Sequence, residues 1–186
     1  MSLAVYVDQS RTVPRHNRAA SPYDAPVRLT VSVHISAKAD YAVRAAIQLA
    51  SSSEFPVTSE SIATAQDIPA KFLEAILSQL RQSGLVRSRR GVHGGYWLSR
   101  PAAEISVADV IRAVEGPMAL VRGERPEKID YHGSAEPLRE VWVAVRAALR
   151  GVLSNVSLAD LATGTVPKHI KKLTGDPAAW AAPWFD

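Results

Sequence analysis

The pattern of hydrophobic and polar positions changes near residue 36 from a period of two to a helical period. In residues 27–35 every second residue is apolar, from Val27 to Ile35, and this alternation predicts a β-strand with one apolar face. Beyond it, apolar residues recur at i, i+3, i+4 and i+7. This second pattern predicts a buried helix of about four turns, capped by Ser36, with core positions Ala42, Ala45, Ala46 and Leu49.

Two further helices are predicted close together in the sequence. Thr58 is a favourable N-cap for the segment "SESIATAQ", which ends in the turn "DIP". Pro69 suits the first position of a third helix, and Gly84 suits its C-terminal end. Two helices joined by such a tight turn are typical of a helix-turn-helix. The core stripe of the third helix consists of Leu73, Ile76, Leu77 and Leu80.

A β-hairpin is predicted directly after the third helix. The segments "LVRS" (85–88) and "GYWLS" (95–99) have β propensity, and "RRGVHGG" between them carries the glycines that a hairpin tip needs. Tyr96 and Trp97 are neighbours on one strand, so one of them is expected to pack on the core while the other faces outward. We interpret the hairpin as the wing of a winged helix-turn-helix.

The rest of the chain is predicted to be helical around one polar loop. Ser106 and Asp109 form a capping box for a helix that ends at Gly116. After the loop, a seam of apolar residues at spacings of four and three indicates a helix that pairs with a partner helix. A helix that packs only on its own domain has a similar stripe, and this alternative stays open. The seam residues are Leu138, Trp142, Val145, Leu149, Val152 and Val156.

These elements predict a mainly α fold with a small β-hairpin. Residues 1–26 mix prolines, arginines and small polar residues without periodicity, and we expect a flexible N-terminal arm. Residues 27–116 form the winged helix-turn-helix domain, 117–135 a loop, and 136–163 the long dimerisation helix with a short helix after it. Residues 164–186 are expected to be a C-terminal tail with a basic start and an aromatic end.

Charge and composition point to a polyanionic partner. The 186 residues include 22 Lys and Arg, 18 Asp and Glu, and no cysteine, which excludes disulfides, thiolate metal sites and cysteine nucleophiles. Between Arg81 and Arg100 there are five arginines and no acidic residue. A segment that carries only positive charge favours double-stranded DNA as the partner. No segment is long and apolar enough for a membrane helix or a secretory signal, so we expect a soluble, cytoplasmic protein.

No catalytic or metal-binding motif is found. The sequence has no phosphate-binding loop with a lysine, no paired histidines at zinc spacing and no nucleophile elbow, so we expect no enzymatic activity and no cofactor. His132 lies between Asp130 and Glu136 in the polar loop. A single loop histidine among carboxylates is usually solvated, and we predict no metal site there.

Three segments resemble a known family of regulators. The segments are "ADYAVRAAIQLA", "IPAKFLEAILSQLRQSGLVRSRRGVHGGYWLSRPAAEISVADVIRAVEGP" and "VSLADL". They are similar to the winged-helix family that includes the iron-sulfur regulator IscR, the nitric-oxide-sensing NsrR and the cysteine-metabolism regulator CymR, and the match runs from about Ile35 to Leu161. The resemblance implies a dimeric transcription factor, and most members are repressors.

The resemblance also implies which residues contact DNA. The third helix is the family's recognition helix, where Lys71 is placed to donate to guanine or a phosphate and Glu74 to accept from a cytosine amino group. Arg90 stands where the family places an arginine that enters the minor groove, and the wing tip lies against phosphates. Together with the charge pattern, the expected DNA-binding residues are Ala70, Lys71, Glu74, Arg81, Arg87, Arg89, Arg90, His93 and Gly94.

One departure from the family changes the expected regulation. Cluster-binding relatives carry three cysteines before the dimerisation helix, and this chain has "MALVRGERPEKIDYHGSAEPLRE" there with none. A cysteine-ligated iron-sulfur cluster is therefore excluded. Three alternatives for the effector then stay open. It is a small molecule bound between the first helix and the dimerisation helix, it is another protein, or the regulator has no effector.

The sequence thus predicts a homodimeric DNA-binding transcriptional regulator, expected to be a repressor that binds a pseudo-palindromic operator. The two recognition helices would lie about 34 Å apart, in successive major grooves. The alternative is a regulatory protein-interaction module with the same fold in which DNA binding is weak or lost.

Overall fold

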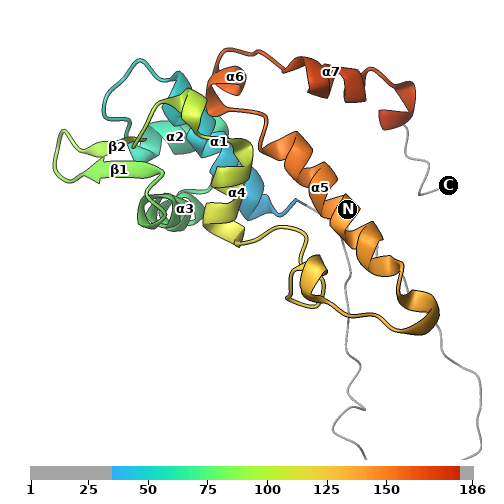
Figure 1. Cartoon of the computed structure of the whole chain (residues 1–186). Coiled ribbons are helices and arrows are strands. Elements are labelled where there is room, and N and C mark those ends of the chain that lie inside the picture. Colours follow the sequence, from blue (N-terminus) through green and yellow to red (C-terminus); the bar gives the residue numbers. More distant parts are fainter. Residues whose placement is uncertain (1–34, 181–186) are drawn as a thin grey trace, which may run out of the picture. The chain divides into compact units, whose positions relative to one another are not determined.

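The computed structural model describes residues 35–180, which form a helical body with one two-stranded hairpin at one end (Figure 1). The expected arm 1–26 lies outside the described residues, and so does the expected strand apart from Ile35, which is not in a strand. None of the described helices combines the length and the apolar character needed to cross a bilayer. The elements are α1 (Ala37–Ser51), α2 (Ser59–Gln66), α3 (Ala70–Gln82), β1 (Val86–Arg89), β2 (Gly95–Leu98), α4 (Val107–Glu115), α5 (Leu138–Leu153), α6 (Leu158–Ala162) and α7 (Lys168–Thr174), with 3₁₀ turns at Ala102–Glu104, Pro126–Lys128, Gly133–Ala135 and Pro177–Ala179.

Helix α1 lies at the centre of the core. It contacts α2, α3, α4, α6 and β2, and its buried face consists largely of alanines. Because alanine adds little bulk, several elements approach the same helix closely. The Ser36 hydroxyl accepts from the Ala39 N–H at the start of α1 and donates to the Glu115 carboxylate 2.8 Å away, which ties α1 to the end of α4. The buried side chains of α1 are Ala39, Ala42, Ala45, Ala46 and Leu49.

The predicted helix-turn-helix is formed by α2 and α3. Thr58 caps α2, and Asp67 ends it in the left-handed region at φ 48°, a conformation that Asp adopts more readily than most residues. Ile68, buried in the turn, holds the two helices to the core. The predicted stripe of α3 is buried at all four positions, and Gly84 follows the helix at φ 76°. Pro69 precedes the first helical residue instead of occupying it.

The wing is an antiparallel hairpin with Val86 opposite Leu98 and Arg87 opposite Trp97. It gains an additional edge from the loop before α2. The Val57 N–H donates to the Tyr96 carbonyl at 3.0 Å, and the Tyr96 N–H donates to the Val57 carbonyl at 2.8 Å. The wing is therefore hydrogen-bonded to the helical body along one side.

Two capping boxes bring the start of α4 next to the start of α6. Ser106 and Asp109 form the first box, as predicted, and Ser157 and Asp160 form the second. Between them, the Val107 N–H donates to the Val156 carbonyl and the Leu158 N–H donates to the Ile105 carbonyl, both at 2.9 Å. The chain thus returns to the domain immediately after α5.

Two segments differ from the sequence prediction. Val156 was predicted to continue the seam of α5, but α5 ends at Leu153, and Val156 is only 8 % exposed in a cluster with Ala39, Val107 and Ile111. Its side chain belongs to the core of its own chain, because the capping box at Ser157 requires extended backbone before α6. The predicted tail contains the helix α7 and a 3₁₀ turn.

A substitution at Gly95 tests the contact between the wing and the body. A Cβ at this position would lie 2.5 Å from the Val57 carbonyl oxygen, so that the edge pairing would have to shift. We expect Gly95→Ala to lower the free energy of unfolding by about 1–3 kcal/mol. Urea unfolding followed by circular dichroism measures this, with Val92→Ala at the exposed wing tip as the control. Equal stabilities of the two variants would contradict the close contact.

Candidate nucleic-acid interface

The first turns of α3 present a solvent-exposed face opposite the buried stripe. Ala70, Lys71 and Glu74, all predicted DNA contacts, are exposed on it. Phe72 between them is 61 % exposed, and its ring centroid lies 6.5 Å from that of Tyr41 on α1. The helical period of the sequence predicts this exposure, because Phe72 lies one residue before the buried Leu73 and off the apolar stripe.

The two faces of the wing differ in character. Tyr96 packs against the core, as one member of the aromatic pair was expected to do. Trp97 lies opposite Arg87 on the other face, and its ring centroid is 5.2 Å from that of Phe55 in the loop before α2. A hollow between the end of α3 and this outer face is lined by Arg81, Arg87, Trp97 and Arg100 among others. The outer face is therefore basic and aromatic.

Short-range contacts hold the wing tip in shape. The Arg89 guanidinium donates to the His93 carbonyl at 2.8 Å, and the Gly94 N–H donates to the Gly91 carbonyl at 2.8 Å. A Cβ at Gly94 would lie 2.4 Å from the Arg89 carbonyl oxygen, so glycine is required here for the turn itself. Arg90 has no hydrogen bond or ion pair with the described residues and is exposed. The arrangement leaves the Arg90 guanidinium free at the tip.

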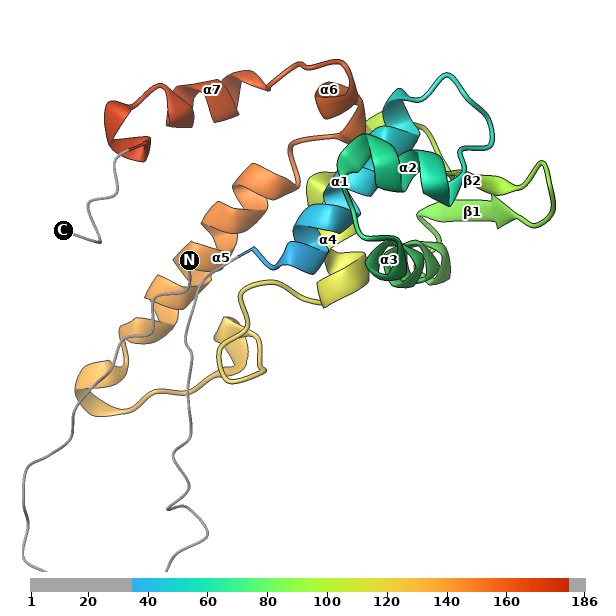
Figure 2. The same ribbon diagram turned by 180° about the vertical axis from the view of Figure 1, so that it is seen from behind.

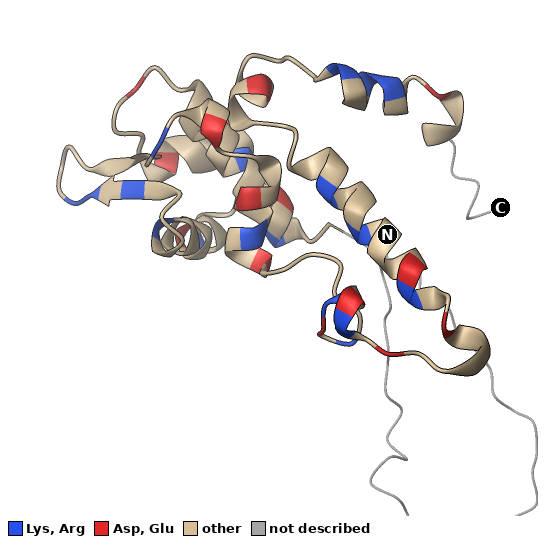
Figure 3. Ribbon diagram, in the orientation of Figure 1, with Lys and Arg blue, Asp and Glu red and all other residues tan. Residues whose placement is uncertain are grey.

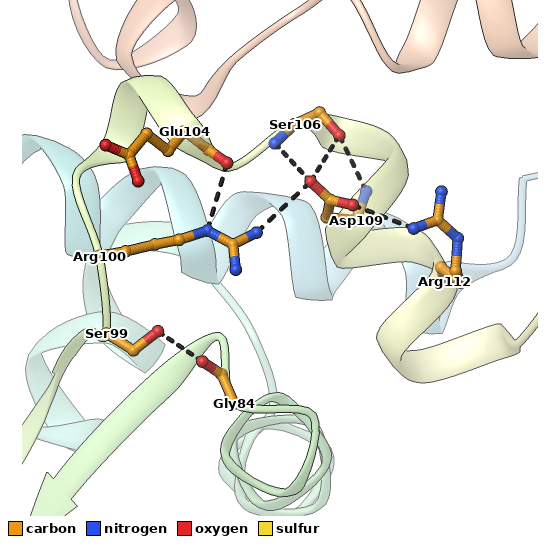
Figure 4. Close-up of polar contacts among 7 residues, drawn as sticks. All are labelled: Gly84, Ser99, Arg100, Glu104, Ser106, Asp109 and Arg112. Carbon is orange, nitrogen blue, oxygen red and sulfur yellow. Dashed lines mark hydrogen bonds and ion pairs between the residues drawn. The ribbon is translucent and has the colours of Figure 1, made fainter.

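Arg100 has an intramolecular role. Its Nε donates to the Glu104 carbonyl at 3.2 Å, and its guanidinium lies 3.6 Å from the Asp109 carboxylate (Figure 4). Asp109 also accepts from Ser106 and pairs with Arg112 at 3.0 Å. Arg100 therefore joins the end of β2 to the capping box of α4.

The hairpin carries positive charge without any acidic residue. In Figure 3 basic residues mark β1 and the wing tip, and the sequence between Arg81 and Arg100 contains no acidic residue. On a folded domain such a purely positive region attracts a polyanion over a distance set by the ionic strength.

Helix α5 has no buried residue, in contrast to α1, α3 and α4. The predicted seam residues Leu138 and Val145 are exposed, Trp142, Leu149 and Val152 are half-buried, and Val141 beside them is 52 % exposed. The indole N–H of Trp142 is buried without a hydrogen-bond partner among the described residues. On the same side of the helix, Arg146 pairs with Glu127 of the preceding loop. The apolar surface of α5 is thus only partly covered by the rest of residues 35–180.

The polar loop does not assemble a metal-ligand set. His132 is exposed, and within residues 35–180 no three His, Asp or Glu side chains gather closely enough to hold a metal ion.

Comparison with known proteins identifies close relatives. The family model described as "Rrf2: Iron-dependent Transcriptional regulator" matches residues 35–164. Rv1287 of Mycobacterium tuberculosis (strain ATCC 25618 / H37Rv), an HTH-type transcriptional regulator by name, is 47 % identical over 145 residues, which are 77 % of this chain and 90 % of the relative.

Solved structures agree with this similarity. The structure of CymR, the global cysteine regulator of B. subtilis, is 36 % identical with a TM-score of 0.61, over 73 % of this chain and 100 % of that one. IscR of T. potens is 31 % identical with a TM-score of 0.58, over 74 % and 96 %. The fold is therefore the winged-helix fold of these regulators.

The pH dependence of stability tests the Asp109 site. Burial raises the pKa of Asp109, but the hydrogen bonds from Ser106 and the charges of Arg112 and Arg100 outweigh it and hold the pKa below its usual value. The stabilisation is then present above the unfolded pKa of about 3.9 and is lost as the pH falls through the folded pKa. We expect Asp109→Asn to lower the free energy of unfolding by about 1 kcal/mol at pH 7 and to have little effect near pH 2.

Urea unfolding at several pH values measures this difference. Glu104→Gln is the matched control, because the Glu104 carboxylate makes no hydrogen bond or ion pair with the described residues. A difference between Asp109→Asn and the wild type that stays constant with pH would contradict a role for the ionised carboxylate.

Proposed function

Because this chain belongs to the Rrf2 family of transcriptional regulators, we propose that it is a homodimeric repressor that binds a pseudo-palindromic operator in the cytoplasm. The observation that carries this proposal is the combination of an exposed α3 face with a neighbouring wing that bears arginines and no acidic residue. In Figure 1 the wing and α3 lie beside each other at one end of the helical body.

Base recognition is assigned to the first turns of α3. Lys71 donates to guanine or to a phosphate, and Glu74 accepts from the cytosine amino group. Phe72 supplies an apolar surface for a thymine methyl group, a contact supported by its exposure between these two residues. The contacts with base edges then come from one exposed helical turn, whose backbone is held by the buried stripe on the opposite side.

The wing is assigned to the minor groove. Arg90 inserts into the groove, where narrow A·T-rich segments attract guanidinium groups. Arg87 lies on the outer face of the wing and Arg81 at the end of α3. Both are assigned to phosphates, together with His93 at the wing tip. Arg89 contributes charge at the same place while it also braces the tip through the His93 carbonyl.

Dimerisation is assigned to α5. Its apolar residues Leu138, Trp142, Val145, Leu149 and Val152 are half-buried or exposed in the single chain, and a second α5 would remove them from water. A dimer with two-fold symmetry presents two copies of α3 to two half-sites about 34 Å apart. Operator symmetry would then match protein symmetry. Repression follows when the operator overlaps a promoter.

The proposed regulator holds no cysteine-ligated iron-sulfur cluster. The chain has no cysteine, so thiolate ligation of iron is impossible.

Binding to genomic DNA tests the proposed interface. Fragments from the source genome, including the region upstream of the gene, are compared at two salt concentrations by electrophoretic mobility shift and fluorescence anisotropy. We expect Arg90→Ala to weaken specific binding by about ten- to a hundredfold, because a groove contact is lost, and the logarithmic salt slope to be smaller by about one.

Lys128→Ala provides a control with the same change of charge in the polar loop, where Lys128 is exposed and has no ion pair among the described residues. Specific binding that is equally strong in the Arg90→Ala variant would refute the assignment of the wing. Absence of any specific fragment for the wild-type protein would refute operator binding itself.

A further inference from the structure

Helix α7 lies beyond the segment matched by the family model and is almost uncovered. It spans Lys168–Thr174, whereas the family match ends at residue 164, and none of its residues is buried. A helix of two turns is unstable in water by itself, because nucleation costs more than so few hydrogen bonds return. Its stability must therefore come from packing against other elements.

The contacts of α7 with its own chain are limited. Ile170 packs against the small cluster around Val107 and Val156, and the Trp180 indole N–H donates to the Thr174 carbonyl at 2.7 Å. Leu173 nevertheless remains 55 % exposed and Trp180 76 % exposed. Such a pair of large apolar side chains on one short segment is typical of a surface that packs against another chain.

The charges of α7 also lack partners. Lys168, Lys171 and Lys172 form no ion pair with the described residues. The nearest following acid, Asp176, accepts from the Ala178 N–H as the cap of the next turn. Figure 3 shows α7 as a basic segment on the side of the molecule away from the hairpin.

The beginning of α5 has the opposite charge. Glu136 and Glu140 are exposed and form no ion pair with the described residues, while Arg139 between them lies 3.9 Å from Asp130. Val141 is exposed directly after Glu140. The first turn of α5 and the residue just before its cap, Glu136, therefore offer carboxylates and an apolar side chain, which complement the lysines and apolar residues of α7.

We propose that α7 of each protomer clasps the first turn of its partner's α5 in the homodimer, an inference that rests on the proposed dimerisation through α5. The lysines pair with the partner's Glu136 and the partner's Glu140, and Leu173 and Trp180 cover the partner's Val141. If the two α5 helices pack antiparallel, the start of one lies beside the end of the other. From that end the chain passes through α6 directly into α7.

The position of α7 favours a second protein chain over DNA. In both Figure 1 and Figure 2 the hairpin and α7 extend from opposite ends of the helical body. The same views place α7 on the end from which α5 extends. The clasp thus adds to the surface already assigned to dimerisation.

A charge exchange in the full-length protein tests the clasp. We expect the double variant Lys171→Glu, Lys172→Glu to raise the dimer dissociation constant about tenfold, because the two-fold axis doubles a modest exposed ion-pair effect. Adding Glu136→Lys and Glu140→Lys to the same chain restores dimerisation. Sedimentation equilibrium measures the dissociation constant, and circular dichroism verifies that each variant is folded.

The matched control reverses two charges on the wing. Arg87→Glu, Arg89→Glu is expected to abolish DNA binding and to leave the dimer dissociation constant unchanged. An unchanged dissociation constant in the α7 variant would overturn the clasp alone. Weaker DNA binding together with that unchanged dissociation constant would instead assign the lysines to phosphates. A wild-type protein that is monomeric at all concentrations would overturn the proposed dimer together with the clasp.

Discussion

The architecture depends on close packing against the alanine face of α1. Ala42, Ala45 and Ala46 leave almost no side-chain volume on this face, and α2, α3, α4 and α6 all contact the same helix. A larger side chain at any of these positions would separate at least one of these helices from α1. The exposed face of α3 is therefore oriented by the small buried alanines of α1.

The wing is positioned by the same core through two connections. Val57 pairs with Tyr96 at one edge, and Arg100 joins the end of β2 to Asp109 of α4. These contacts fix both the edge and the base of a hairpin that would be weak alone. A basic segment held in this way loses less conformational freedom on binding than a mobile arm would, so more of its electrostatic attraction appears as affinity.

The local signals of the sequence predict most of the fold and fail where a long-range contact decides. The caps at Ser36, Thr58 and Ser106 and the stripe of α3 are confirmed, because each depends on residues within one or two turns. Val156 satisfies the seam spacing, but the distant backbone of Val107 pairs with it and removes it from α5. Helix α7 was missed because two turns are too short to give a recognisable period.

The two attachments of α5 give this helix, the proposed dimerisation element, a mechanical role. One end is held by the pairing of Ser106 with Ser157, and the Glu127–Arg146 ion pair holds the polar loop against its middle. Because α4 packs against α1 and α3, any displacement of α5 relative to the domain also changes the direction of α3 with respect to the two-fold axis of the proposed dimer. In the proposed dimer, the distance between the two copies of α3 then depends on how the polar loop packs. Glu127 and the buried Pro126 thus connect the packing of the polar loop to α5 and, in the proposed dimer, to the orientation of α3.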